Sequence, residues 1–132
     1  MLIMNAKTLR IKALAKQKSE LNNSVESIKS FIKEAESKML KLVDVKSEET
    51  DETIQSKAKL YMKEADKVVN KIHTLPTVNY ELVNKRTQAR NEILKYEWYL
   101  NNISGNRLLK VLAEYVNAVN NWITLEMQIR NI

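Results

Sequence analysis

The 132-residue chain contains a single glycine and a single proline. Folds built from β-strands place these residues at many turns, so this composition argues against sandwiches, barrels and βαβ folds. Apolar residues also recur at alternating steps of three and four along most of the sequence, which is the spacing of one helical face. The chain is therefore predicted to be all-α and to form one helical domain over residues 1–132.

Polar and turn-forming segments divide this periodicity into four predicted helices. The first ends at the polar segment 46–51, where Thr50 is the expected N-cap of the second helix. The second helix is expected to stop at Pro76, and the third to begin at 77–79. The third is expected to end at Gly105, a residue suited to a left-handed turn after a helix.

Short connections between four amphipathic helices favour an antiparallel up-down-up-down four-helix bundle. Asn106 is the expected cap of the fourth helix. The first helix is expected to reach about 60 Å, against about 37 Å for each of the others. Its surplus lies at the N-terminus, so residues 1–18 are predicted to form an extended arm continuous with this helix.

Five cations and no acid are found in residues 1–18. They are Lys7, Arg10, Lys12, Lys16 and Lys18. The whole chain has a net charge of +6, so the arm holds most of the excess. Five cations are few for a surface that binds nucleic acid or a membrane. We therefore expect the apolar residues of the arm to pack on a sister subunit. Binding to the phosphates of DNA is the next alternative, and contact with an anionic membrane surface is less favoured.

The fourth helix carries two apolar faces, whereas a surface helix usually carries one. The first is aliphatic: Leu109, Leu112, Val116, Val119 and Ile123. The second is partly aromatic: Leu108, Val111, Tyr115, Ala118, Trp122, Leu125, Ile129 and Ile132. We expect the chain to be too small to bury both faces. The aliphatic face is therefore predicted to point inward and the aromatic face to meet a neighbouring subunit.

The predicted subunit interface combines this aromatic face with two aromatic residues of the third helix that lie off its apolar seam. Its residues are Trp98, Tyr99, Leu108, Val111, Tyr115, Trp122, Leu125 and Ile129. Aromatic side chains outside a core seam are enriched at protein interfaces. They also occur as ordinary surface residues whose polar atoms reach water.

Three polar residues interrupt or end apolar seams. Lys18 and Arg86 are expected to pack their stems and extend their charges to solvent. The alternative is a buried charge that fixes the register of the helices. His73 is expected to lie near a helix C-terminus and interact with its dipole.

Missing residue types exclude several kinds of chemistry. Without cysteine there is no disulfide, thiolate nucleophile or cysteine-based zinc site. One histidine and one glycine exclude the HExxH motif and the common glycine-rich phosphate loops. No catalytic, cofactor-binding or metal-binding residue is predicted, and we expect a non-enzymatic protein without a cofactor.

A cysteine-free, single-domain helical chain of this size resembles the four-helix-bundle coat proteins of spindle-shaped and two-tailed archaeal viruses. The resemblance is one of architecture and composition, and it implies a virion shell subunit that surrounds DNA. We therefore expect a self-assembling structural protein, a homo-oligomer or larger assembly, located in the virion or the cytoplasm. The alternatives are a nucleic-acid-binding accessory protein and a small helical inhibitor or immunity-type protein. No signal peptide or transmembrane segment is predicted.

If the arm binds DNA, deletion of residues 1–18 is expected to abolish retention on DNA at low salt. The helical circular-dichroism signal should stay nearly intact, because the removed cations lie outside the predicted bundle. Unchanged DNA retention by the truncated chain would place the electrostatic contact elsewhere.

Overall fold

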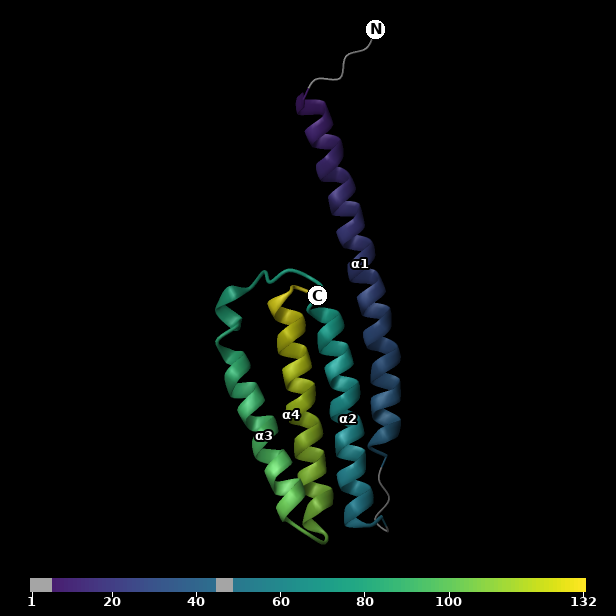
Figure 1. The fold of residues 1–132 in the computed structure, drawn as a ribbon, viewed down its shortest axis with the longest axis vertical. Helices are drawn as coiled ribbons and strands as arrows, with labels where there is room; N and C mark the ends of the chain where they lie inside the picture. Colours follow the sequence, from purple (N-terminus) through teal and green to yellow (C-terminus); the bar gives the residue numbers. More distant parts are fainter. Residues whose placement is uncertain (1–5, 45–48) are drawn as a thin grey trace.

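The computed structural model describes residues 6–44 and 49–132, and the side chains from residue 24 onward within these ranges. Its elements are α1 (Ala6–Leu42), α2 (Asp51–Ile72), the short 3-10 helix η1 (Tyr80–Leu82), α3 (Lys85–Asn102) and α4 (Arg107–Ile129). Every regular element in these ranges is helical, which confirms the predicted all-α class (Figure 1).

The helix α4 is central to the packing. It packs against both α2 and α3, and α1 packs mainly against α2. In Figure 1, α2 and α3 lie on either side of α4, and α1 lies along α2. Buried side chains from all four helices form one continuous hydrophobic core.

Both apolar faces of α4 are covered within the chain. On the aromatic face, Tyr115 is 1% exposed and Trp122 is 6% exposed. Leu108, Val111 and Ile129 are buried on the same face. The prediction that these five residues form a subunit interface is therefore wrong.

The physical reason is that α4 has helical neighbours on two sides. A helix packed between two others needs an apolar face toward each of them. The aliphatic face buries Leu112, Val119 and Ile123, whereas Leu109 and Val116 are only partly covered. The expectation that 132 residues cannot bury both faces is thus also wrong.

The first turn of α2 has the predicted cap. The side-chain oxygen of Thr50 accepts a hydrogen bond from the backbone N–H of Thr53 at 3.2 Å. At its other end, α2 stops at Ile72 and does not continue to Pro76. Leu75 follows in a turn and is buried in the core.

The segment between α2 and α3 is bound to the end of α4. The backbone N–H groups of Val78 and Asn79 both donate to the carbonyl oxygen of Ile129, at 2.8 and 2.9 Å. The side-chain amide of Asn79 also donates to the carbonyl oxygen of Gln128 at 2.6 Å. These bonds satisfy carbonyls that a helix C-terminus leaves free. Because residues 78–79 are used in this way, α3 begins at Lys85 and not at the predicted 77–79.

The connection between α3 and α4 turns at Gly105, which has a φ of +80°. Glycine adopts this left-handed conformation without a steric penalty, as the sequence predicted. Its N–H also lies 3.3 and 3.4 Å from the two carboxylate oxygens of Asp51 at the start of α2. Asn106 occupies the N-cap position of α4 but makes no side-chain capping bond, so that detail of the prediction is wrong.

Helix α1 contains 37 residues, whereas α2 contains 22. Its described buried residues begin at Ile28 and continue at helical spacing. The ammonium group of Lys71, in the last turn of α2, lies 5.6 Å from the centroid of the Phe31 ring. Because α2 ends one residue later, this contact fixes where the end of α2 falls along α1.

The two tryptophans provide a direct test of this burial. Trp122→Ala is expected to lower the free energy of unfolding of the subunit by about 3–5 kcal/mol, because it leaves a cavity beneath α3. Trp98 is 60% exposed, so Trp98→Ala should change the stability of the monomer by about 0.5 kcal/mol or less. Urea unfolding at low protein concentration measures both. Equal effects of the two substitutions would contradict the placement of Trp122.

Candidate functional site

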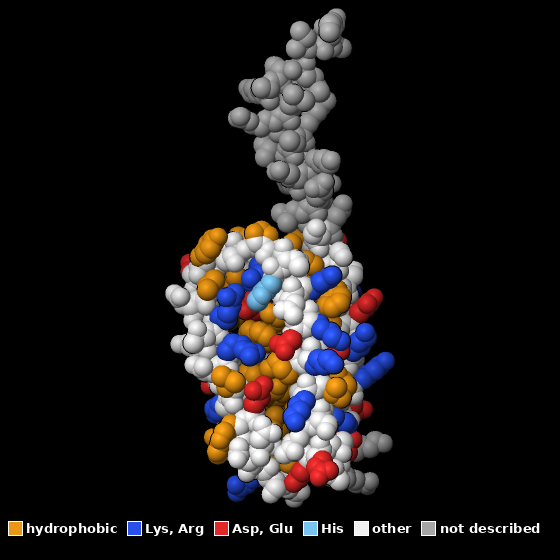
Figure 2. Space-filling model, viewed as in Figure 1, with side chains coloured by type: hydrophobic (Ala, Val, Ile, Leu, Met, Phe, Trp, Pro, Cys, Tyr) orange, Lys and Arg blue, Asp and Glu red, His pale blue; other side chains and the backbone are white. Residues whose placement is uncertain are grey.

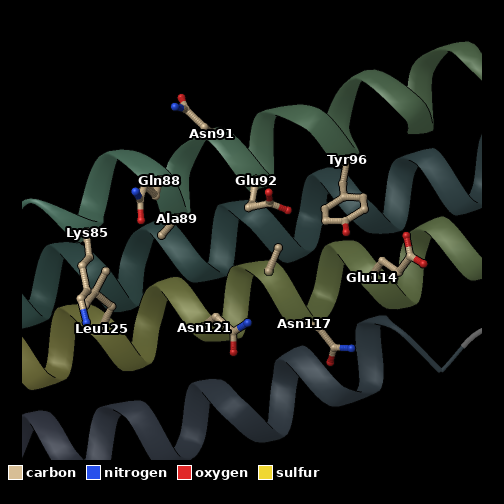
Figure 3. A pocket seen from close by; sticks show the side chains of 11 residues that line it. Lys85, Gln88, Ala89, Asn91, Glu92, Tyr96, Glu114, Asn117, Asn121 and Leu125 are labelled. Atoms are coloured by element: carbon tan, nitrogen blue, oxygen red, sulfur yellow. The ribbon is translucent and has the colours of Figure 1, made fainter.

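An open groove of about 700 Å³ runs between α3 and α4 (Figure 3). Six of its eleven lining residues carry an amide or a carboxylate. The lining residues are Lys85, Gln88, Ala89, Asn91, Glu92, Tyr96, Glu114, Asn117, Ala118, Asn121 and Leu125. Leu125, a predicted interface residue, is partly buried here.

The chemistry of this groove suits contact with a polar surface. Amide side chains offer both hydrogen-bond donors and acceptors. Glu92 pairs with Lys95 of the same helix at 3.8 Å. Small-molecule sites are usually concave and mostly apolar, with a few polar groups. An open groove rich in amides is closer in character to a protein contact surface.

A basic hollow of about 410 Å³ adjoins this groove and shares Tyr96 and Glu114 with it. It contains the cations Lys95, Arg107 and Lys110 beside two tyrosines. The ammonium group of Lys95 lies 5.0 Å from the centroid of the Tyr96 ring. Cations next to aromatic rings are typical of surfaces that bind single-stranded nucleic acid. Sequence analysis missed this hollow because its cations come from two different helices.

The most polar part of the core surrounds Glu126, which is 0% exposed. The Nε and Nη2 atoms of Arg86 donate to its two oxygens at 2.7 and 3.3 Å. Nη1 of Arg130 donates to Oε2 at 2.8 Å. Nε2 of His73 lies 2.8 Å from the same oxygen. One buried carboxylate is thus held by three basic side chains.

This cluster joins one end of three helices. His73 directly follows the last residue of α2, Arg86 is in the first turn of α3, and Glu126 is in the last turn of α4. Nε of Arg130 also donates to the carbonyl oxygen of Leu75 at 3.2 Å. A buried charge is costly unless it is paired and hydrogen-bonded, and here the pairing depends on the relative position of all three helices.

Two opposing effects set the pKa of Glu126. Burial is the larger single effect and raises the pKa, because it disfavours the charged form. Hydrogen bonds and charge attraction from Arg86 and His73 together outweigh burial, so the pKa lies below its ordinary value. The carboxylate is therefore ionised at neutral pH.

The prediction that Arg86 extends its charge to solvent is wrong, because its guanidinium pairs with buried Glu126. The alternative, a buried charge that fixes register, describes it better. His73 lies at the C-terminal end of α2, as expected, but its ring contacts Glu126. Glu126 itself was missed, although it lies four residues after Trp122 and three before Ile129, which is the spacing of the apolar face.

The remaining predicted site residues lie apart from this cluster. Trp98 is exposed on α3, and Tyr99 is partly buried with its ring in edge contact with Trp98 at 5.4 Å. The arm side chains lie outside the described residues: Lys7, Arg10, Lys12, Lys16 and Lys18. The described residues include no group of three histidines, aspartates or glutamates placed to hold a metal ion.

The chain matches no known protein family, and neither a curated protein nor a solved structure matches it. Among its described helices, none combines the length and the apolar character needed to cross a membrane. No relative therefore supplies a function for this chain.

Glu126→Gln is expected to lower the free energy of unfolding at pH 7 by about 3–5 kcal/mol, because the guanidinium groups of Arg86 and Arg130 then face a neutral amide. The pKa of Glu126 is lowered in the folded state. The ionised carboxylate therefore stabilises the fold above about pH 4.3, the usual pKa of an unfolded glutamate. This stabilisation is lost as the pH falls through the folded pKa. Urea unfolding measures the free energy of unfolding of the native chain and of Glu126→Gln at pH 7 and pH 3. The difference between them should be smaller at pH 3.

Glu114→Gln is the matched control, because Glu114 borders the open groove and is only partly buried. Its effect should be about 0.5 kcal/mol or less. An equal difference in free energy of unfolding between the native chain and Glu126→Gln at both pH values would contradict the role of the ionised carboxylate.

Proposed function

We propose that the chain is a non-enzymatic structural protein that assembles with further copies of itself. In this proposal it is an antiparallel up-down-up-down four-helix bundle, and its extended N-terminal helix connects one copy to the next. Among such assemblies, a virion shell subunit is the role that we favour.

The register between α1 and α2 carries this proposal. Phe31 lies beside Lys71, so α2 ends close to that level of α1. Val25 still packs against the core, and α1 begins at Ala6, which is 19 residues or about 28 Å before it. The apolar sequence positions of α1 continue through this stretch, and an apolar helical seam is stable when a partner covers it. A second copy of the chain would supply that partner.

Charge favours contact between the arm and a neighbouring bundle over contact between two arms. The arm sequence has five cations and no acid, so two arms side by side would repel each other. The outer face of α3 offers apolar side chains for such a contact, since Leu94 is 53% exposed and Trp98 is 60% exposed. An arm bound to α3 of the next copy uses different surfaces on the two partners. Contacts of this kind build rings or open filaments.

Nucleic-acid binding is the second candidate function, and the basic hollow favours it. Lys95, Arg107 and Lys110 lie beside Tyr96 and Tyr99 on the described surface. The arm sequence would add further cations. The two functions are compatible, because a shell subunit that surrounds DNA would use both surfaces.

Sedimentation velocity of the full chain and of residues 19–132 tests self-assembly, at low and high salt. The full chain is expected to form large species, and the truncated chain is expected to remain small with its helical signal intact. Trp98→Ala should weaken association by about 2 kcal/mol or more if Trp98 anchors the contact. Leu60→Ala, at an apolar residue of α2 that is 47% exposed, is the control. A full chain that stays monomeric at high concentration would refute the proposal.

A further inference from the structure

The basic hollow carries positive charge that its own lining does not neutralise. Lys95 comes from α3, and Arg107 and Lys110 come from the start of α4. Lys95 pairs with Glu92 at 3.8 Å, whereas Arg107 and Lys110 form no ion pair within the described ranges. On the face shown in Figure 2, by contrast, lysine and arginine side chains are interspersed with acidic ones. The hollow therefore offers two unpaired cations to an anionic partner.

Two tyrosine rings line the same hollow and lie next to its cations. The ring centroids of Tyr96 and Tyr99 are 6.5 Å apart, and their planes are tilted by 48°. The ammonium group of Lys95 lies 5.0 Å from the centroid of the Tyr96 ring. Both tyrosines also pack against the hydrophobic core, which holds their rings in place. The hollow thus combines flat apolar surfaces with positive charge.

This combination distinguishes between anionic partners. Cations alone suffice for the phosphates of a duplex, whose bases are stacked on one another. A single strand exposes the faces of its bases as well, and aromatic side chains beside cations bind such faces by stacking. The two tyrosines therefore favour a strand whose bases are not paired.

We propose that the basic hollow binds single-stranded nucleic acid, with phosphates at Arg107 and Lys110 and a base against the Tyr96 ring. This inference rests on nucleic-acid binding as the second candidate function, and it names the kind of strand and the residues that hold it. The same chemistry serves single-stranded DNA and RNA, because both supply phosphates and base faces.

The neighbouring groove gives the strand a direction. Tyr96 and Glu114 line both the hollow and the groove, and in Figure 3 they lie at one end of the groove. The groove lining has two acids, Glu92 and Glu114, against the single cation Lys85. Phosphates are therefore favoured in the hollow and disfavoured in the groove. Asn117, at the shared end, offers a donor and an acceptor to a base edge.

Fluorescence anisotropy of a labelled thymidine oligonucleotide of about twelve nucleotides, within the usual range of site sizes, tests the site with the full chain. Lys110→Gln is expected to weaken binding and to reduce the slope of log K against log salt by about 0.7, the value for one lost phosphate contact on a single strand. Lys63→Gln removes an exposed lysine of α2 and is the matched control. It should leave both the affinity and the slope unchanged.

Substitutions at Tyr96 test the stacking contact. Tyr96→Leu should weaken binding about tenfold, because it removes the ring that stacks on a base. Tyr96→Phe keeps the ring and should bind like the native chain. A uridine oligonucleotide of the same length compares the two sources of the strand. Tighter binding of one oligonucleotide would identify its source, and equal binding would mean that phosphates and base faces alone are recognised.

Three results would overturn the inference in different ways. Unchanged binding by both Lys110→Gln and Tyr96→Leu would move the nucleic-acid contact away from the hollow, while nucleic-acid binding itself would stand. A duplex bound as tightly as the single strand would overturn the kind of strand. No binding of either nucleic acid at low salt would refute both this inference and the second candidate function. Self-assembly is judged separately, by the sedimentation of the chain alone.

Discussion

The packing of α4 between α2 and α3 is the constraint on which the other features depend. Because α4 contributes apolar side chains to both neighbours, it contains ten buried residues, whereas α2 contains seven. Helix α3 can then be short and largely polar, with only Ile93 and Leu100 fully buried. Helix α1 packs mainly against α2, so only one face of α1 contributes to the core. The grooves beside α4 follow from the same arrangement, since its two neighbours leave its remaining surface open.

Glu126 and its three basic partners give this packing a defined register. Hydrophobic contacts between helices tolerate sliding, because one apolar side chain can replace another. An ionised carboxylate in the core tolerates it less, since each lost hydrogen bond leaves a buried charge without compensation. Arg86, Arg130 and His73 come from three separate parts of the chain, so their meeting at one carboxylate specifies how those parts align. The backbone bonds from residues 78–79 to Ile129 support the same end of the core.

The described surface gathers polar, aromatic and charged side chains beside α3 and α4. Amides, carboxylates and tyrosines line the groove between α3 and α4, and cations gather at one part of it. The exposed apolar residues Leu94 and Trp98 lie on the outer face of α3. These features are properties of binding surfaces.

The sequence by itself determined the helical class, the number of long helices and most of their breaks. Scarce glycine and proline exclude other classes, and local features such as Thr50 and Gly105 act on the backbone next to them. It did not determine which face of α4 points where, because Tyr115 and Trp122 are as suitable for an interface as for a core. That choice depends on which helices lie beside α4. The start of α3 was misplaced for a similar reason, since residues 78–79 bind the carbonyl oxygen of Ile129, about 50 positions later in the chain. Arg86, His73 and Glu126 are far apart in sequence, and their charges became one cluster only when tertiary packing brought three helix ends together.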